Sequence, residues 1–264
     1  CLRSTRALRR LGTTPHASHL ASETIDTAAA PVQSAGALAL VGSGEYLPQM
    51  QALEAALIDD AVRRGKRRAY IQIPTAAGRE SADRLEYWRT LGAEQGRRIG
   101  VETTFLRVLD RDDAEDPLFA AQIEDAALVY MSGGDPRYLA ESVRGTRVGR
   151  AIETHWRTGG ALAGCSAGAM VMGRTVPWFR LRFGAATEGL NLTPTIQVLP
   201  HFNRIFELAF TGDSGEGVLL GIEDLTALVR PSGADRWRVE GLGAVHILRG
   251  APKRILRAGE TIEL

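Results

Sequence analysis

The residues best suited to chemistry lie at positions 164–168 (GCSAG), where Ser166 has a glycine two places before it and two places after it. A serine exposed on a tight turn between a strand and a helix needs small neighbours there, because larger side chains would collide across the turn. Centring the turn on Cys165 would put alanines at those positions, so Ser166 is the better candidate nucleophile. The alternative is a glycine-rich turn that only packs closely or binds an anion at a helix start.

Positions 132–135 (SGGD) form a second candidate loop, directly after a buried apolar run. Two adjacent glycines allow the backbone to approach a bound group closely. The amide of Gly133 or Gly134, together with that of Ala167, could hold the oxyanion of a tetrahedral intermediate. In the alternative interpretation this is an ordinary loop whose Asp135 caps the following helix.

A serine nucleophile needs a base, and histidine is the usual one. Of the five histidines, His16 and His19 lie in an N-terminal segment of unusual composition. We expect His155 on a charged helix surface and His246 inside a late strand. His201 directly follows a predicted strand, where site residues collect, and is the best candidate by elimination.

A carboxylate must orient that histidine. From the residues alone, two candidates stay open: Asp224, which follows the histidine, and Glu188, which lies between the serine and the histidine. Either could instead be a solvated surface carboxylate.

These candidates require a scaffold that brings distant turns to one edge. From residue 36, short apolar runs alternate with longer amphipathic segments, a rhythm that predicts βαβ units and a parallel sheet. The predicted strands cover 36–41, 68–74, 101–108, 126–131 and 161–164, and the predicted helices cover 47–64, 81–95, 113–124 and two stretches within 137–158. The predicted fold class is α/β, a doubly wound and mostly parallel sheet that binds ligands at the carboxyl ends of its strands.

The last third of the chain contains closely spaced strand-like runs, at 196–199, 225–229, 237–239, 244–248 and 253–256. We expect them to extend the same sheet in antiparallel fashion, so that residues 36–264 form a single domain. Residues 1–35 carry four arginines before the first acid, Glu23. They are expected to be a disordered or non-native tail, the alternative being a segment that resembles a transit peptide.

Composition excludes several classes of function. The 264 residues are 44% hydrophobic and 24% charged, with a mean hydropathy of −0.10, as in a globular protein with one substantial core. The 32 basic and 31 acidic residues are interspersed and give a net charge of +1, so we expect no nucleic-acid partner. No apolar run approaches the roughly 18 to 20 residues that cross a bilayer, so we expect no membrane association. Two cysteines cannot form a disulfide framework, which favours the cytoplasm.

Cofactor motifs are also missing from the sequence. Residues 42–45 (GSGE) follow the first predicted strand, but Leu47 stands where a dinucleotide-binding motif would need its third glycine. Neither a His-Glu-x-x-His motif nor paired Cys-x-x-Cys spacing occurs. We therefore expect no cofactor and no metal.

Taken together, four blocks resemble the serine peptidases that include cyanophycinase and dipeptidase E, in both order and spacing. The blocks are 132–135, 164–169, 200–202 and 221–224. The resemblance implies a fold related to the class I glutamine amidotransferases, which is flavodoxin-like, with Ser166 as nucleophile and His201 as base. Cyanophycinase-like members place the acid at the position of Asp224, whereas dipeptidase E takes it from between serine and histidine. We select Asp224, with Glu223 and Glu188 as alternative acids.

The resemblance further implies a serine-type exopeptidase or dipeptidase-like hydrolase that acts on a small peptide. Cyanophycinase-like enzymes carry several arginines after the His-Phe pair, but Arg204 is the single basic residue in 203–210. Cyanophycin is therefore not the expected substrate. A small peptide, one with an acidic residue included, fits better, with Asp135, Arg137 and Arg204 as candidate substrate contacts. Both arginines could instead be surface residues.

Two other functions stay open, together with the assembly state. A catalytically silent binding protein on the same fold is favoured if His201 and Asp224 do not converge on Ser166. An amidotransferase-like domain would use Cys165, which the spacing of the glycines argues against. A homodimer is left open.

Overall fold

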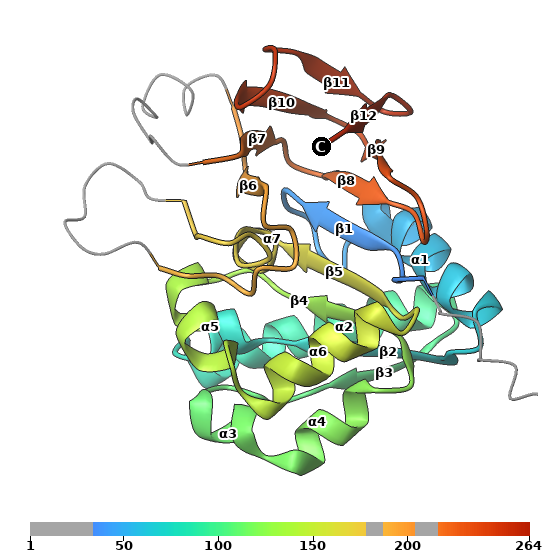
Figure 1. The fold of residues 1–264 in the computed structure, drawn as a ribbon. Helices are drawn as coiled ribbons and strands as arrows, with labels where there is room; N and C mark the ends of the chain where they lie inside the picture. The colour runs from blue at the N-terminus through green and yellow to red at the C-terminus, as the bar shows by residue number, and fades with distance from the viewer. Residues whose placement is uncertain (1–33, 178–186, 204–215) are drawn as a thin grey trace, which may run out of the picture. The chain divides into compact units, whose positions relative to one another are not determined.

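The computed structural model describes residues 34–177, 187–203 and 216–264. The predicted tail, residues 1–35, lies almost entirely outside these ranges, as does Arg204. Residues 33–264 belong to one compact unit. Within the described ranges, the strands of this unit form an eight-stranded sheet and a separate four-stranded sheet (Figure 1).

Five parallel strands form the centre of the larger sheet, in the spatial order β1-β5-β4-β2-β3. They are β1 (Leu38–Val41), β2 (Arg67–Ile73), β3 (Glu102–Phe105), β4 (Ala126–Met131) and β5 (Ala161–Cys165). Three antiparallel strands continue the sheet beyond β1, namely β8 (Thr226–Arg230), β9 (Arg236–Gly241) and β12 (Thr261–Glu263). The predicted α/β class, with a mostly parallel sheet and antiparallel C-terminal strands, is confirmed.

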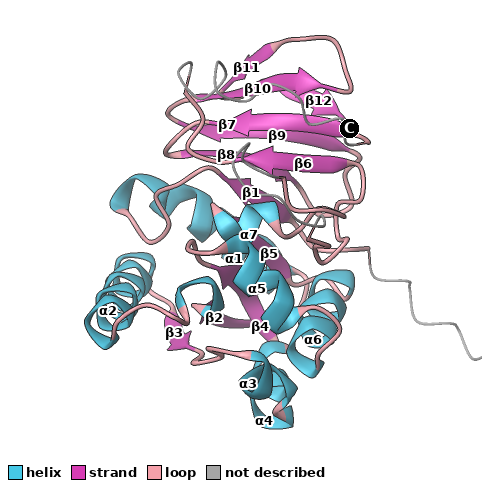
Figure 2. Ribbon diagram, turned by 90° about the vertical axis from the view of Figure 1, so that its left-hand side faces the viewer, coloured by secondary structure: helices cyan, strands magenta, loops and turns pink. Residues whose placement is uncertain are grey.

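Helices cover both faces of the larger sheet, and Figure 2 shows α2 and α6 on opposite sides of it. The helices are α1 (Gln51–Arg63), α2 (Ala82–Ile99), α3 (Arg111–Glu115), α4 (Pro117–Ile123), α5 (Pro136–Val143), α6 (Arg147–Arg157) and α7 (Ala167–Met170), with short 3₁₀ turns η1 (Pro48–Met50) and η2 (Thr75–Ala77). Alternate residues of β1 therefore enter two cores. Leu38 and Leu40 pack in the core that includes residues of α5 and α6, whereas Ala39 and Val41 pack in the core that includes residues of α1.

The single helix predicted over 113–124 is two helices, α3 and α4. Asp116 is extended, with φ −71° and ψ 121°, because the ring of Pro117 disfavours a helical conformation in the residue before it. The Asp116 side chain accepts a hydrogen bond from the amide of Leu118 and so caps α4. In the described part of the chain, no helix combines the length and the apolar character that a membrane crossing requires.

The prediction that every late strand extends the main sheet is wrong for three of the five predicted runs, at 196–199, 244–248 and 253–256. These runs form the smaller sheet together with a fourth strand, β7 (Val218–Ile222), which was not predicted from the sequence. The other three strands are β6 (Ile196–Leu199), β10 (Ala244–Arg249) and β11 (Ile255–Arg257), and the order in the smaller sheet is β11-β10-β7-β6. Alternation of apolar residues identifies a strand but not its partner, and the parallel β6–β7 pair is a long-range contact. Residues 223–225 connect β7 to β8 and so pass from one sheet to the other.

His155 was predicted on a charged surface and is instead fully buried. It lies on the inner face of α6 with Ala151 and Ile152, and its Nε2 lies 2.9 Å from the carbonyl oxygen of Ala161. Burial lowers the pKa of His155 to about 4, so the ring is neutral near pH 7 and donates from Nε2 to that carbonyl. The residue supports the packing of α6 against β5.

Candidate active site

Ser166 occupies a sharp turn between β5 and α7. Its φ of +50° and ψ of −110° are unusual for a residue with a side chain, and its amide donates to the carbonyl of Val41 at 2.9 Å. A Cβ added at Gly164 would lie 2.4 Å from the carbonyl oxygen of Gly168, and one added at Gly168 would lie 2.2 Å from that of Met131. Both glycines are therefore required for the close approach of the strand, the turn and β4.

His201 lies between Ser166 and Asp224. Its Nε2 is 3.1 Å from the Ser166 Oγ, and its Nδ1 is 2.9 Å from the Asp224 Oδ1. The three residues come from three separate places in the fold: the β5–α7 turn, the segment after β6, and the β7–β8 connection. With Nδ1–H donating to the carboxylate, Nε2 is the nitrogen that accepts the serine proton. The side chains of His201 and Asp224 are 52% and 66% exposed, so a substrate can reach them.

The two alternative acids have other partners. Glu188 forms an exposed ion pair with Arg144 at 2.7 Å. Glu223 accepts a hydrogen bond from Nε2 of His246, also at 2.7 Å. Asp224 is the candidate whose carboxylate meets the ring of the serine-bonded histidine.

The loop at 132–135 presents one amide that is not engaged within the described residues. The amides of Ser132, Gly133 and Asp135 already donate, at 3.1, 2.9 and 2.9 Å. The acceptor for Gly133 is the carboxylate of Glu45, so this amide is not available to an oxyanion. The amides of Gly134 and Ala167 have no acceptor in the described part of the chain, so both can donate to an oxyanion.

The predicted substrate contacts are arranged differently. Asp135 caps α5, because its Oδ1 accepts from the amides of Arg137 and Tyr138 at 2.9 and 3.1 Å. The alternative interpretation of Asp135 as a helix cap therefore holds in the structure. Arg137 donates from Nε to Glu141 one turn further along the helix. Arg204 lies outside the described residues.

Glu45 is a site residue that sequence reasoning missed. Its side chain reaches beneath both loops: Oε1 accepts from the Gly133 amide at 2.9 Å, and Oε2 accepts from the Cys165 thiol at 2.8 Å. Cys165 is fully buried, and burial raises the pKa of its thiol well above the usual value, so the thiol stays protonated. That state disfavours Cys165 as a nucleophile. The sequence signal for Glu45 is its place just after the first predicted strand, in the run 42–45, which lacks the third glycine of a dinucleotide motif.

The serine, histidine and carboxylate of the site are side chains suited to proton transfer. Among the described residues, no group of three or more His, Cys, Asp or Glu side chains is arranged to hold a metal ion.

Comparison with known families now defines the class. Residues 38–231 match the model of peptidase family S51, a stretch that includes Ser166, His201 and Asp224. This chain belongs to peptidase family S51. It is therefore a serine peptidase, and the predicted resemblance to that family is confirmed.

Two solved structures are similar to this S51 peptidase. A peptidase from an acI-B1 Actinobacterium is 46% identical, with a TM-score of 0.84, and the match covers 88% of this chain and 98% of that one. A protein named as a peptidase E, from Listeria monocytogenes EGD-e, is 16% identical with a TM-score of 0.60, over 80% of this chain and 100% of that one. The second likeness concerns the fold alone. No curated protein matches the sequence.

Proposed function

We propose that this S51 peptidase hydrolyses small peptides through an acyl-enzyme on Ser166. The observation that carries the proposal is the position of the His201 ring, with one nitrogen 3.1 Å from the serine hydroxyl and the other 2.9 Å from the Asp224 carboxylate. A neutral imidazole held in this way can accept the serine proton as the hydroxyl attacks.

In the proposed first half-reaction, the Ser166 Oγ bonds to the carbonyl carbon of the peptide while its proton moves to Nε2 of His201. The carbonyl π electrons move onto the oxygen, which the amides of Gly134 and Ala167 stabilise. Asp224 stabilises the imidazolium through Nδ1–H. When the tetrahedral intermediate collapses, the C–N bond breaks, and the leaving amine takes the proton from Nε2.

In the second half-reaction, water attacks the acyl ester and gives one proton to Nε2 of His201. Collapse of the second tetrahedral intermediate breaks the bond between the carbonyl carbon and Ser166 Oγ, and Oγ takes the proton back. The products are an amine and a carboxylic acid, and the free serine is restored. Each step uses the same three side chains in reversed roles.

For the substrate, we propose a short peptide cut by an exopeptidase or dipeptidase-like activity, with a preference for an acidic residue. Arg137 supports this because it stands on the first turn of α5, three residues after the proposed oxyanion glycine, and is about half exposed. A planar guanidinium suits a carboxylate. Arg204, three residues after His201 in the sequence, is the second candidate.

The silent binding protein is not favoured. It would require that His201 and Asp224 fail to converge on Ser166, and the observed distances are those of hydrogen bonds.

The test is a peptide library, followed by mass spectrometry, on the wild type beside Ser166→Ala. We expect cleavage by the wild type, none above background with the variant, and covalent labelling of Ser166 by a fluorophosphonate probe. Hydrolysis that survives in Ser166→Ala, or a probe that labels another residue, would refute the acyl-enzyme mechanism.

A further inference from the structure

One buried carboxylate touches both loops of the proposed catalytic centre. Glu45 is 7% exposed and accepts from the Gly133 amide and the Cys165 thiol, one on each carboxylate oxygen. Gly133 immediately precedes Gly134, and Cys165 immediately precedes Ser166. Glu45 therefore contacts the neighbour of the proposed oxyanion donor and the neighbour of the proposed nucleophile at the same time.

The two loops that Glu45 joins come from different strands. The Gly133 loop follows β4 and the Ser166 turn follows β5, and the pairing of Met131 with Gly164 in these neighbouring strands brings the two loops together. The two loops approach closely: a Cβ added at Gly133 would lie 3.3 Å from the Ser166 Cβ and 2.9 Å from the Glu45 Oε1. Beyond that pairing, Glu45 is a side chain that contacts both loops from behind.

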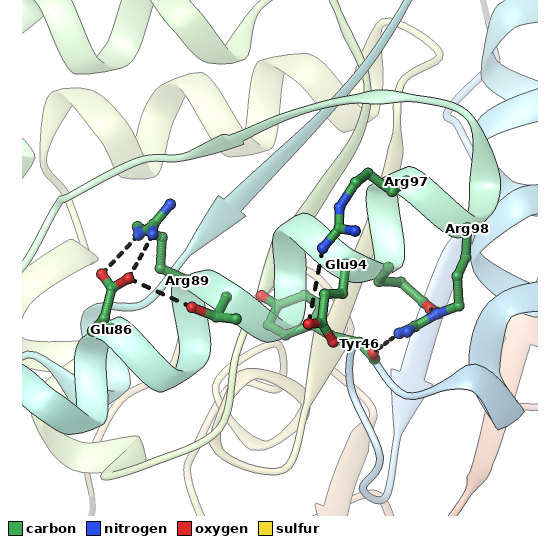
Figure 3. Close-up of polar contacts among 8 residues, drawn as sticks. Tyr46, Glu86, Arg89, Glu94, Arg97 and Arg98 are labelled. Atoms are coloured by element: carbon green, nitrogen blue, oxygen red, sulfur yellow. Dashed lines mark hydrogen bonds and ion pairs between the residues drawn. The ribbon is translucent and has the colours of Figure 1, made fainter.

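The segment that carries Glu45 is itself held from two helices. Tyr46 has a φ of +64°, a conformation that persists only where its surroundings impose it. Its amide donates to Glu54 of α1 at 3.3 Å, and its carbonyl accepts from Arg98 of α2 at 2.7 Å, the contact drawn in Figure 3. Glu45 is in this way fixed before any substrate binds.

We infer that Glu45 is a positioning residue that sets the distance between the Ser166 hydroxyl and the Gly134 amide, an inference that rests on the proposed function. In this role Glu45 acts through the Gly133 amide and the Cys165 thiol and not on the reacting atoms themselves. Glu45 accepts from the Gly133 amide, so the Gly134 amide is left as the oxyanion donor. It also accepts from the thiol of Cys165, the residue directly before Ser166. A displacement of about 1 Å between such groups can cost on the order of 100-fold in rate.

Three substitutions of Glu45 separate the effects of its acceptor atoms, its charge and its length. Glu45→Ala removes both acceptors. Glu45→Asp keeps the charge but withdraws the carboxylate by one methylene. Glu45→Gln keeps the length, so its amide oxygen can still accept from Gly133 while its NH₂ donates to the sulfur of Cys165, which can accept weakly.

We expect kcat to fall about 10- to 100-fold in Glu45→Ala and Glu45→Asp, with KM changed less than about 3-fold, and expect Glu45→Gln to stay within about 5-fold of wild type. The affinity for a peptide boronic acid, which forms a tetrahedral adduct with the serine, should fall by the same factor as kcat/KM. The affinity for an uncleaved peptide, measured by placing each change in the Ser166→Ala background, should not move.

The matched control is Glu54→Gln. Glu54 is also a buried glutamate beside the same segment, but it contacts Tyr46 and Tyr70 rather than Gly133 or Cys165. It should change stability while leaving kcat within about 3-fold, because the amide oxygen of glutamine can still accept from the Tyr46 amide and so keeps the segment of Glu45 in place. Equal loss of kcat in Glu54→Gln and Glu45→Ala would mean a general structural effect and would overturn the inference.

The inference also fails if Glu45→Ala, or Glu45→Asp should the alanine variant not fold, keeps wild-type kcat and boronic-acid affinity. A Glu45→Gln variant as impaired as Glu45→Asp would equally contradict it. These results are distinct from failure of the proposed function, which shows itself as hydrolysis that survives in Ser166→Ala.

Discussion

His201–Asp224 and His246–Glu223 are two histidine–carboxylate pairs whose acids are neighbours in the chain. The second pair is the shorter, at 2.7 Å against 2.9 Å, and the His246 side chain is 13% exposed against 52% for His201. The His246 ring packs on Phe202, whereas the free nitrogen of His201 faces the serine. A close histidine–carboxylate contact therefore does not by itself mark a base. The direction of the second nitrogen and the exposure of the ring separate the two roles.

The largest difference between the two pairs should appear when His201→Gln is compared with His246→Gln. We expect kcat/KM to fall on the order of 10⁴-fold or more in the first, because the serine loses the group that accepts its proton. In the second the loss should stay below about 10-fold. The measurement is steady-state kinetics on a peptide from the library that the wild type cleaves. Similar losses of kcat/KM in both variants would contradict the assignment of His201 as the base.

The two acids offer the next largest difference. Asp224→Asn should lower kcat about 10²- to 10³-fold, because an amide no longer holds the His201 tautomer or stabilises the imidazolium. We expect less than the largest known effects because this carboxylate is 66% exposed. Glu223→Gln should lower kcat less than about 5-fold. If Glu223→Gln proved the more damaging change, the acid would have been assigned to the wrong residue.

Glu54 is a buried carboxylate that has no histidine partner among the described residues: it accepts hydrogen bonds from the Tyr70 hydroxyl and the Tyr46 amide. Burial raises its pKa from 4.5 to about 7, so the folded protein binds an additional proton between those values and its stability falls as pH rises through that window. By pH 8 the free energy of unfolding should have lost up to about 3 kcal/mol.

Urea unfolding at pH 5 and pH 8 measures this effect. Glu54→Gln should show a correspondingly smaller loss between the two pH values. His155, whose lowered pKa destabilises the fold on the acid side, contributes the opposite slope in both proteins and cancels in the difference. Identical pH dependence in wild type and variant would disprove the assignment to Glu54.

The smallest effect concerns the His246–Glu223 pair itself. Because it is only partly buried, a double-mutant cycle with His246→Gln and Glu223→Gln should give a coupling energy of about 1 kcal/mol in unfolding. The same cycle on kcat should show little coupling. A kinetic coupling as large as that of His201 with Asp224 would make the second pair part of the reaction.

Much of the site could be predicted because its residues carry local signatures. Steric need fixes glycines at 164 and 168, and the blocks around Gly133, His201 and Asp224 follow one another in a recognisable order. Glu45 has no such signature, since its role depends on meeting two loops far away in the sequence. The occupied amide of Gly133 could not be predicted for the same reason.

The elements of the fold were more predictable than their partners. Apolar runs identified the five parallel strands, and Pro117 already indicated a helix boundary that the predicted helix ignored. His155 could have been placed correctly from its spacing with Ala151 and Ile152, a helical period that its charged neighbours obscured. The smaller sheet could not be predicted from the sequence. Its strand β7 overlaps the block 221–224 that carries the acid and is not among the predicted strands, and strand pairing is set by tertiary contacts.

The crossing of residues 223–225 from one sheet to the other has a consequence for how the enzyme matures. Ser166 is presented by the larger sheet, while His201 follows a strand of the smaller one and Asp224 stands at the crossing. A chain that has completed either sheet alone holds an inert set of side chains. In refolding, peptidase activity should return no earlier than the slowest structural signal.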